Sequence, residues 1–342
     1  MEALVEKVRE AAAKGTPLRI HGGGTKHFLG LPVAGEPLDV REHAGILDYQ
    51  PDELFVRAAA GTPLQEVEAA LAEAGQLLPF EPPAFGDSAT LGGTIACGLS
   101  GPARPWRGAA RDFVLGCRMV NGRGELLRFG GEVIKNVAGY DLSRLQCGAF
   151  GTLGVLLELS IKTLPAPAAE RTLAFELPLP GALERLHRWN RQPLPLTGAA
   201  WHDGILRLRL AGAEAAVEQA ARRLGGEAER EEGYWQALKE HRLLFFDNPL
   251  PLWRLSLPRG CGPLPLPGEV LVDWGGAQRW LFSDAEPGVV HALAREAGGS
   301  ARPWRNGALL EPESPLLPLH RRLKEAFDPA GILNPGLMHP EL

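Results

Sequence analysis

Three glycine-rich stretches in the first half of the chain limit its fold more than any other feature of the sequence. The first stretch follows the short strand expected at 18–21 and consists of Gly22, Gly23, Gly24, Thr25 and Lys26. Glycine backbones can turn so that several N–H groups point at one anion. A pyrophosphate fits such a loop, although no long helix obviously follows it and the spacing to Lys26 is too short for a Walker loop.

The second stretch, 85–101, holds five glycines and several hydroxyl side chains among small residues. A segment with so few large side chains indicates the close approach of a ligand or of another backbone. A packed glycine turn without a ligand explains a single loop equally well. A third stretch, 132–155, repeats the composition, and three such loops in one domain favour a bound ligand.

Composition excludes several classes of protein. The chain has 342 residues, enough for two domains, and its net charge of −5 comes from interspersed acids and bases without a basic stripe for nucleic acid. The four cysteines form no CxxC pair and are expected to be small buried side chains. No window approaches the ~18 apolar residues of a membrane span. We therefore expect a cytoplasmic protein without direct membrane insertion, any membrane association coming through partner subunits.

Element patterns divide the chain into three parts. Asn121-Gly122 between the alternating segments 113–120 and 125–129 predicts a β-hairpin. After the strand at 154–162, the segment 165–167 (PAP) suggests a boundary, and antiparallel strands with helices on one face are expected beyond it. The predicted domains are 1–167, 168–310 and 311–342.

One pentapeptide occurs twice. ARPWR stands at 103–107 and again at 301–305. The flanking sequences differ, so the echo does not predict a structural repeat. Coincidence is the preferred interpretation.

Four motifs in their order resemble a known superfamily. They are PLRIHGGGTKHFLG (17–30), GDSATLGGTIACGLSGPARPWRGAARDFVLG (86–116), VIKNVAGYDLSRLQCGAFGTLGVL (133–156) and FDPAGILNPG (327–336). The chain resembles the vanillyl-alcohol oxidase/para-cresol methylhydroxylase (VAO/PCMH) flavoproteins, and among them the FAD-binding subunits of bacterial glycolate oxidase. The resemblance covers nearly the whole chain. It implies an α+β fold with a two-part PCMH-type FAD-binding domain, a smaller antiparallel α+β (ferredoxin-like) cap domain and a C-terminal tail returning to the flavin domain.

The resemblance also implies which residues bind FAD. The first loop would cradle the pyrophosphate, the second would support its other side, and further residues would meet the isoalloxazine, the ribityl chain or the adenine. The implied residues are Gly22, Gly23, Gly24, Thr25, Lys26, Asp87, Ser88, Thr90, Leu91, Gly92, Gly93, Ser100, Gly101, Arg104, Gly108, Gly154 and Val155. Some relatives attach FAD to a histidine just after the first glycines. Here His21 precedes them and His27 is a remote alternative, so non-covalent FAD is expected.

The catalytic residues stay unknown at this stage. The HxGDGNLH-like motif associated with catalytic relatives is absent, and the nine dispersed histidines form no HxH or HxxxH pair, so no metal site is predicted. Candidates for the flavin face are Arg104, Lys135, Tyr140 and Asn334, with Arg107 and Asn136 beside them. An arginine can bind a carboxylate in bidentate fashion, although surface ion pairs are the commoner role.

Two functions from different classes follow from the resemblance. In the first, the chain is an FAD-dependent subunit of a glycolate oxidase complex that oxidises a small 2-hydroxy acid. In the second, it is a non-catalytic assembly partner that keeps FAD for structure. A standalone D-2-hydroxy-acid dehydrogenase is a poorer third. The implied partners are a larger homologous FAD subunit and an iron-sulfur subunit. An apolar run at 243–246 is a candidate partner surface, with domain core as the favoured alternative.

Overall fold

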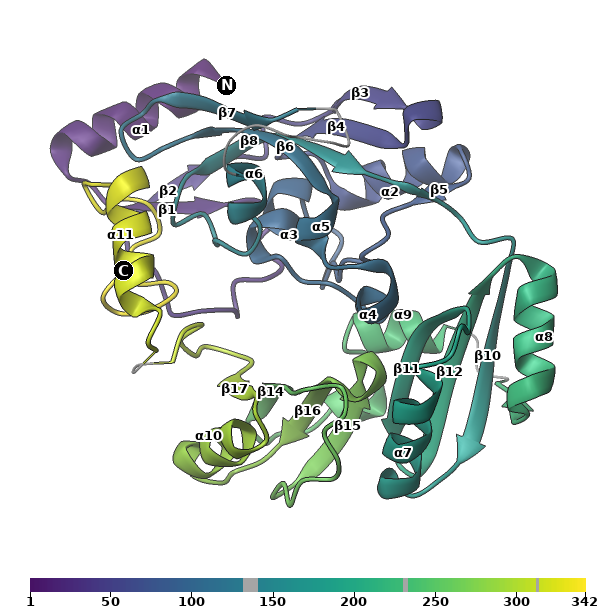
Figure 1. Cartoon of the computed structure of the whole chain (residues 1–342). Helices are drawn as coiled ribbons and strands as arrows, with labels where there is room; N and C mark the ends of the chain where they lie inside the picture. The colour runs from purple at the N-terminus through teal and green to yellow at the C-terminus, as the bar shows by residue number, and fades with distance from the viewer. Residues whose placement is uncertain (132–140, 230–232, 312–313) are drawn as a thin grey trace. The chain divides into compact units, whose positions relative to one another are not determined.

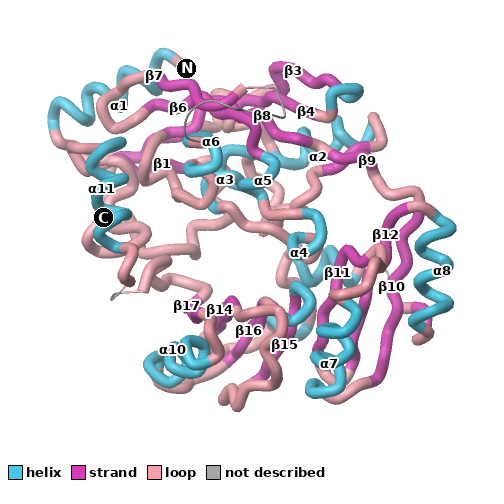
Figure 2. The backbone as a smooth tube through the Cα atoms, in the orientation of Figure 1, coloured by secondary structure: helices cyan, strands magenta, loops and turns pink. Residues whose placement is uncertain are grey.

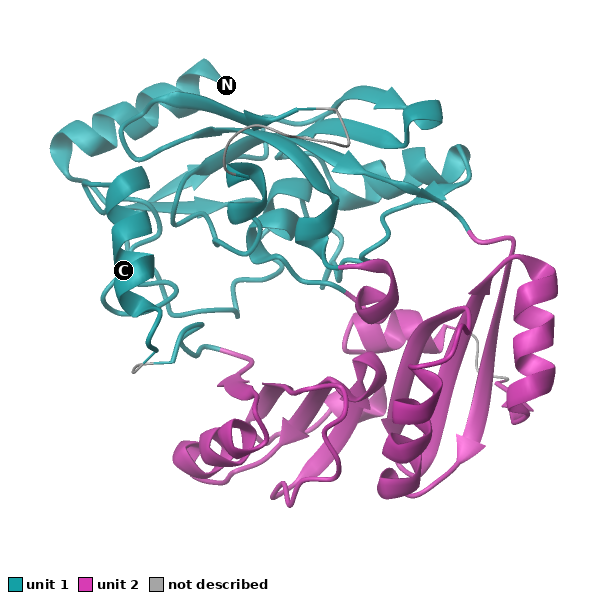
Figure 3. Ribbon diagram, in the orientation of Figure 1, with its two compact units in different colours: residues 1–100, 109–166, 306–342 teal, residues 101–108, 167–305 magenta. Residues whose placement is uncertain are grey.

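The chain folds into two compact units, described from a computed structural model over residues 1–131, 141–229, 233–311 and 314–342 (Figure 1). Unit 1 comprises Met1–Ser100, Ala109–Ala166 and Asn306–Leu342, and unit 2 comprises Gly101–Gly108 and Pro167–Arg305 (Figure 3). Each unit has its own buried apolar clusters. The units are therefore described one at a time.

Unit 1 begins with a helix and two short parallel strands. The helix α1 (Glu2–Lys14) buries Leu4, Val5, Val8 and Ala11, and ends where Gly15 adopts a φ of 65°. Strand β1 (Leu18–His21) pairs in parallel with β2 (Glu36–Asp39). The first glycine loop starts directly after β1, so its position is set by a buried strand end.

The second part of unit 1 is a five-stranded antiparallel sheet in the order β3-β4-β8-β6-β7. The strands are β3 (Ile46–Gln50), β4 (Phe55–Ala59), β8 (Val155–Lys162), β6 (Val114–Val120) and β7 (Leu126–Gly130). The predicted hairpin is confirmed, because β6 pairs with β7 from Gly116–Gly130 to Val120–Leu126. Helices α2 (Leu64–Glu73) and α3 (Leu91–Cys97) contribute Leu64, Leu71, Leu91 and Ile95 to the core of this sheet.

Short elements complete unit 1. They are the 3-10 helix η1 (Pro51–Glu53), the paired strands β5 (Gln76–Leu77) and β9 (Leu164–Pro165), and the helices α5 (Ala110–Phe113), α6 (Leu142–Leu145) and α11 (Leu317–Phe327). Long loops connect them, drawn pink in Figure 2. The tail after α11 returns to β1, where Leu18 N donates to Ile332 O at 2.7 Å.

Unit 2 is built on one eight-stranded sheet in the order β13-β10-β12-β11-β15-β16-β14-β17. All described pairings in it are antiparallel. Its strands are β10 (Ala169–Glu176), β11 (Leu196–His202), β12 (Ile205–Gly212), β13 (Glu227–Ala228), β14 (Leu252–Ser256), β15 (Glu269–Asp273), β16 (Gln278–Phe282) and β17 (Ser300–Pro303). Each half places its four strands in the order 4-1-3-2, and the halves join through β11 and β15. This internal repeat of topology carries no matching sequence.

Helices lie on both faces of the unit 2 sheet. Helices α7 (Leu179–Trp189), α8 (Glu214–Leu224) and α10 (Pro287–Glu296) pack on one face, where α7 and α8 meet Leu206, Leu208 and Leu210. Helix α9 (Tyr234–Lys239) lies on the opposite face, since Trp235 Nε1 donates to Thr172 Oγ1 at 2.8 Å. The expectation of helices on one face was therefore incomplete. The unit also holds α4 (Arg104–Arg107) and the 3-10 helices η2 (Leu244–Phe246) and η3 (Trp274–Gly276).

The units differ from the predicted division 1–167, 168–310 and 311–342 in two places. Residues 101–108 pack with unit 2, where Trp274 Nε1 donates to Gly101 O at 3.0 Å. The tail from Asn306 packs with unit 1. Sequence patterns are local, and these two assignments depend on contacts across more than 150 residues.

Two smaller expectations are met only in part. Cys117 and Cys147 are buried, and burial raises the pKa of each thiol to about 12, whereas Cys97 and Cys261 are only half-buried. Within the run 243–246, Phe245 and Phe246 belong to the core, while Leu244 is 90% exposed. Half of this run is thus interior.

Candidate functional site

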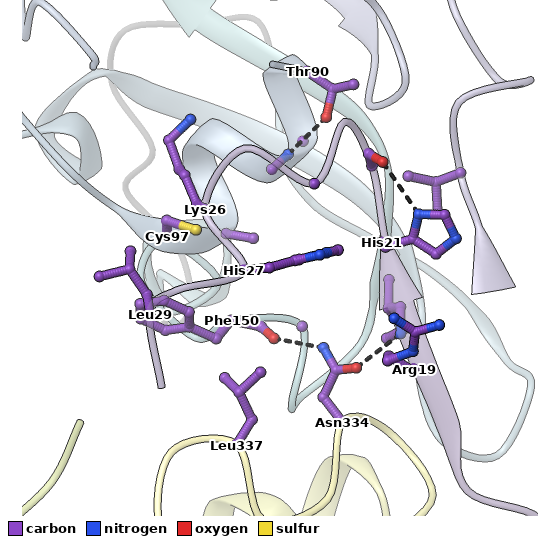
Figure 4. Close-up of a pocket in the computed structure, with 18 of the residues that line it drawn as sticks. Arg19, His21, Lys26, His27, Leu29, Thr90, Cys97, Phe150, Asn334 and Leu337 are labelled. Atoms are coloured by element: carbon purple, nitrogen blue, oxygen red, sulfur yellow. Dashed lines mark hydrogen bonds between the residues drawn. The ribbon is translucent and has the colours of Figure 1, made fainter. Parts of the chain in front are cut away.

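A cavity of about 310 Å³ opens in unit 1 where β1, α3, the 150–156 segment and the C-terminal tail meet (Figure 4). Cavities of this size are at the lower end for small-molecule and cofactor sites. Seven of the residues that line it are glycines: Gly22, Gly23, Gly24, Gly92, Gly93, Gly151 and Gly154. Part of each predicted glycine stretch thus reaches one place.

The first glycine loop presents backbone amides that the protein does not use. Over the described ranges, no residue accepts a hydrogen bond from the N–H of Gly23, Gly24 or Thr25. Gly24 has a φ of 74°, a conformation that favours glycine. Successive free amides around a left-handed residue form an anion-binding nest. A pyrophosphate group would satisfy them.

The second glycine stretch holds the first loop in place from behind. Ser88 Oγ donates to Gly23 O at 2.7 Å, and a Cβ at Gly23 would overlap the carbonyl of Ser88. A Cβ at Gly22 would likewise overlap the side chain of Thr90. Only glycine lets the two segments approach so closely, and this approach fixes the conformation of the nest.

The amides at the start of α3 are already paired within the protein. Leu91 N donates to Thr62 O at 2.9 Å and Gly92 N to Ala60 O at 2.8 Å. The side chain of Thr90 caps the helix by accepting from Gly93 N at 3.2 Å. Thr90, Gly92 and Gly93 therefore line the cavity without free amides to offer, and Leu91 points into the core.

The charged side chains that line the cavity are basic. They are Arg19, His21, Lys26 and His27, and among the residues that the structure describes no aspartate or glutamate lines it. Lys26 is almost fully buried, and its ammonium donates to Ala84 O at 3.1 Å, the carbonyl that also accepts from Thr25 Oγ1 at 2.6 Å. The local field favours a negatively charged ligand.

Both histidines that line the cavity lie beside the nest. His21 Nδ1 is 3.2 Å from Gly22 O, and the rings of His21 and His27 are 6.3 Å apart, edge to face. Partial burial, followed by the charges of His21 and Arg19, lowers the pKa of His27. His27 is thus biased toward the neutral form when no anion is bound.

The C-terminal tail closes the cavity through Asn334. Its Oδ1 accepts from Ile20 N and its Nδ2 donates to Phe150 O, both at 2.8 Å. The side chain is buried, and both of its polar atoms are engaged by backbone. Asn334, a catalytic candidate from the sequence, therefore ties the tail to β1 and to the third glycine stretch.

The remaining predicted residues fall into three groups. Gly154 lines the cavity, but Val155 next to it is buried in the core because strand side chains alternate. Asp87 is exposed beside Gln65, and Ser100 Oγ accepts from Ala110 N, so neither lines the cavity. Gly101, Arg104 and Gly108 belong to unit 2, as does Arg107, while Lys135, Asn136 and Tyr140 lie outside the described residues.

Sequence reasoning missed several lining residues. Arg19 precedes the loop by three positions, and the apolar residues Leu29, Leu31 and Val33 follow it, so proximity to the loop was the available signal. Phe150 lies within the third glycine stretch and Leu337 directly follows the 327–336 motif, so their place in or beside a motif was the available signal. Across the described ranges, no group of three or more His, Cys, Asp or Glu could hold a metal ion. In the same ranges, no helix is long and apolar enough to cross a membrane.

Comparison with known proteins defines the class. Residues 1–130 match the family described as FAD binding domain, and residues 309–338 match the family of FAD linked oxidases, C-terminal domain. The fold and the cavity thus belong to an FAD-linked oxidoreductase subunit. The chain is 51% identical to the glycolate oxidase subunit GlcE of Escherichia coli, over 100% of this chain and 98% of that protein. The chain belongs to the GlcE family of glycolate oxidase subunits.

Other relatives match over part of their length. The glycolate oxidase subunit GlcD of Bacillus subtilis is 33% identical over 46% of this chain and 34% of that protein. The D-2-hydroxyglutarate dehydrogenase of Xanthomonas citri is 33% identical over 52% of this chain and 38% of its own length. Among solved structures, an alkyldihydroxyacetonephosphate synthase matches with a TM-score of 0.69 at 16% identity, over 98% of this chain and 74% of that one. This last likeness concerns the fold alone.

Proposed function

We propose that this chain is the FAD-binding subunit of a glycolate oxidase complex and takes part in oxidising glycolate to glyoxylate. The observation that carries the proposal is the cavity of unit 1, with its unpaired glycine amides and the basic side chains of its lining. Membership of the GlcE family supplies the substrate class. A small 2-hydroxy acid such as glycolate is the expected substrate.

FAD fits the residues present. The amides of Gly22 to Thr25 and the ammonium of Lys26 would hold the pyrophosphate, and the glycines at 92–93 and 154 line the same cavity. Bound flavin supplies the two-electron acceptor for the oxidation. The protein's own residues bind and orient the cofactor and exclude water from it. The predicted contacts from Ser100, Gly101, Arg104 and Gly108 to the flavin belong to this proposal.

Non-covalent attachment is part of the proposal. His21 directs Nδ1 toward the carbonyl of Gly22, and the ring of His27 lies next to Gly24 of the nest, a position suited to a phosphate neighbour. Acid precipitation of the holoprotein tests this, because non-covalent FAD passes into the supernatant. A yellow pellet would contradict it.

The fold is proposed to be a two-part PCMH-type FAD domain with a ferredoxin-like cap and a returning tail. The 4-1-3-2 order of the first four strands of unit 2, with helices α7 and α8, supports the ferredoxin-like description. The tail of unit 1 supplies a backbone neighbour to β1. The predicted domain limits 1–167, 168–310 and 311–342 describe the same parts, with 101–108 counted with the cap.

The proposed partners are a larger homologous FAD subunit and an iron-sulfur subunit. The glycolate oxidase subunit GlcD of Bacillus subtilis matches 46% of this chain, which supports a homologous partner. Any association with a membrane would come through such partners. Within unit 2, the 90% exposed Leu244 is a point at which a partner contact would bury apolar area.

A second candidate function is a non-catalytic assembly partner that keeps FAD for structure. The missing HxGDGNLH-like motif favours this candidate. The unused amides of the nest argue against a chain that has lost its flavin, because a loop built in this way leaves polar groups without partners. The two candidates differ in whether glycolate reduces the flavin of this subunit.

The deciding experiment is anaerobic addition of glycolate or D-lactate to the purified chain, with and without its partner subunits. Bleaching of the flavin band near 450 nm is the expected result for the chain or for the complex. Flavin that stays oxidised in this subunit while the complex turns over would favour the assembly partner. A colourless chain that takes up no added FAD would contradict both.

A further inference from the structure

A half-buried arginine stands among three tryptophans on one face of the unit 2 sheet. Arg254 of β14 points away from α7, α8 and α10, and its guanidinium carbon is 4.9, 5.9 and 5.7 Å from the ring centroids of Trp274, Trp280 and Trp304. Its Nε donates to Gln278 Oε1 at 2.6 Å. Rings and amide together hold the guanidinium in one orientation.

The outer edge of that guanidinium has no partner in the protein. Among the residues that the structure describes, none accepts a hydrogen bond from Nη1 or Nη2 of Arg254, and no carboxylate lies within 4.0 Å. The side chain is half-buried, and neither nitrogen is among the buried polar atoms that lack a partner. Both terminal nitrogens therefore face an accessible space. This free edge is the part of arginine that binds carboxylates in bidentate fashion.

Two further arginines add positive charge at the same place. Arg302 lies directly opposite Arg254 in the pairing of β14 with β17, and Arg104 stands over the ring of Trp274 at 4.5 Å. Like charges directly opposite on neighbouring strands destabilise a sheet. Burial, followed by the charges of Arg302 and Arg104, lowers the pKa of Arg254. A bound anion would remove this repulsion.

The two copies of ARPWR supply these neighbours. Arg104 comes from the first copy, in helix α4, and Arg302 from the second, in strand β17. Their backbones differ, so the copies are not a structural repeat. Each nevertheless delivers its arginine to the surroundings of Arg254.

The oxygens of Asp273 have hydrogen-bond partners other than Arg254. Oδ1 accepts from Trp274 N at 2.6 Å, and Oδ2 accepts from Gln278 Nε2 at 3.2 Å. Burial, only partly offset by these two hydrogen bonds, raises the pKa of Asp273 to about 7. Asp273 orients Gln278, and Gln278 in turn orients Arg254.

The backbone at this place is strained. Trp274 has a φ of 53°, which is unusual for a large side chain, and its Nε1 is held by Gly101 O at 3.0 Å. Strain of this kind persists where the surrounding structure over-determines it and clusters at functional sites. Here it places the indole ring against both Arg104 and Arg254.

We propose that Arg254, flanked by Arg104 and Arg302, forms a binding site for a small carboxylate anion within unit 2. Its terminal nitrogens bind the carboxylate, while the tryptophans exclude water and the flanking arginines stabilise the negative charge. The identification of this anion as the 2-hydroxy acid rests on the proposed function. The existence of the site does not.

The test is calorimetric titration of the full-length chain with sodium oxalate and sodium glycolate, in a buffer free of chloride, phosphate and sulfate. Saturable binding of at least one of the two anions is expected, with glycolamide, the uncharged analogue of glycolate, binding at least about tenfold more weakly. Arg254→Gln should weaken the binding at least about tenfold. Arg254→Lys should be weakened as well, because an ammonium lacks the bidentate edge.

Arg185→Gln is the matched control. Arg185 also stands over aromatic rings of unit 2, 5.8 Å from those of Phe175 and Trp189, but on the α7 side of the sheet, and its loss should leave the affinity unchanged. If Arg254→Gln does not fold, Arg104→Gln and Arg302→Gln replace it, and each should weaken binding several-fold. Equal affinity in the wild type and the folded cluster variants would overturn the proposal, as would the absence of binding or equal binding of glycolamide.

Failure here is distinguishable from failure of the proposed function. The titration needs no flavin, and FAD absorbance, which reports the cavity of unit 1, should be the same in the wild type and in Arg254→Lys. A chain that binds carboxylate but does not oxidise glycolate would retain this site and lose the proposed activity.

Discussion

At the scale of single residues, Gly23 carries the contact that shapes the anion nest. A Cβ there would overlap the backbone carbonyl of Ser88, which cannot rotate away as a side chain could. Gly23→Ala should therefore cost about 1–3 kcal/mol of unfolding free energy and weaken FAD binding at least about tenfold. Denaturant unfolding and FAD titration measure the two effects.

Gly288 offers the matched control for Gly23. It lies in the first turn of α10 with nothing within 4 Å of a Cβ. Gly288→Ala should leave FAD binding unchanged and keep or slightly raise stability, since alanine favours a helix by up to about 1 kcal/mol over glycine. Equal FAD affinity in both variants would show that the nest does not depend on this contact.

The raised pKa of Asp273 predicts a specific pH dependence of the unfolding free energy. Burial raises its folded pKa to about 7, above the ordinary value of 3.8, so between these values the folded state binds more protons than the unfolded state. The contribution of this residue to the unfolding free energy should fall as pH rises from about 4 to about 7, and stay constant outside that window.

Asp273→Asn should remove this component of the pH dependence. One pKa unit corresponds to about 1.4 kcal/mol, so the wild type should lose up to a few kcal/mol between pH 5 and pH 8 through this group, and the variant should not. Denaturant unfolding at the two pH values measures it. Asp52→Asn, which changes an exposed carboxylate, should leave the dependence intact. An unchanged slope in Asp273→Asn would refute the assignment.

Individual site residues were predictable where the signal was local. The cavity is lined by Gly22 to Lys26, Gly92, Gly93 and Gly154, all of which the resemblance implied as FAD-binding residues. The same motifs also marked Asp87 and Val155, which face solvent and core respectively. A motif identifies a segment, and the direction of each side chain depends on the fold around it.

At the scale of elements, the tail after α11 acts as a brace for β1. Asp328 accepts from Ile332 N and Leu333 N, and its carboxylate pairs with the Lys324 ammonium at 2.8 Å. Lys324 also donates to Thr152 O and Leu333 O. The FDPAGILNPG motif is therefore explained by one buried ion pair that shapes the tail.

Asp328→Asn should loosen this brace. The variant leaves the buried ammonium of Lys324 without its carboxylate, and breaking such a pair costs about 3–5 kcal/mol. Hydrogen exchange at Leu18 and Ile20 should accelerate, because Ile332 O and Asn334 Oδ1 accept from their amides. Glu325→Gln, an exposed change in the same helix, should leave both amides protected. Unchanged exchange in Asp328→Asn would contradict the bracing role.

Element prediction succeeded where periodicity and turns were strong, as in the hairpin of β6 and β7. It did not anticipate α9 on the second face of the unit 2 sheet, nor the placement of 101–108 in unit 2. Both depend on long-range contacts of tryptophan side chains, which no short window of sequence contains. The repeated 4-1-3-2 order likewise has no sequence counterpart.

At the scale of the whole molecule, two ligands are assigned to two units. We propose FAD as the ligand of the cavity of unit 1 and a small carboxylate as the ligand of the Arg254 cluster of unit 2. A ligand that binds only the folded state stabilises it, by about 2.7 kcal/mol at one hundred times its Kd. The proposed cofactor site could be predicted from the sequence because its residues lie in contiguous loops. The residues of the proposed carboxylate site come from four separate segments, so no local motif indicates that site.

In the proposed holoprotein, the backbone amides of the first glycine loop hold FAD. The most direct test follows the amide resonances of Gly22, Gly23, Gly24 and Thr25 by nuclear magnetic resonance as FAD is added to the deflavinated, isotope-labelled chain. We predict large shifts at these amides that saturate at one FAD per chain, because each gains a charged acceptor it now lacks. Saturating FAD binding that leaves these amides unmoved would contradict the account.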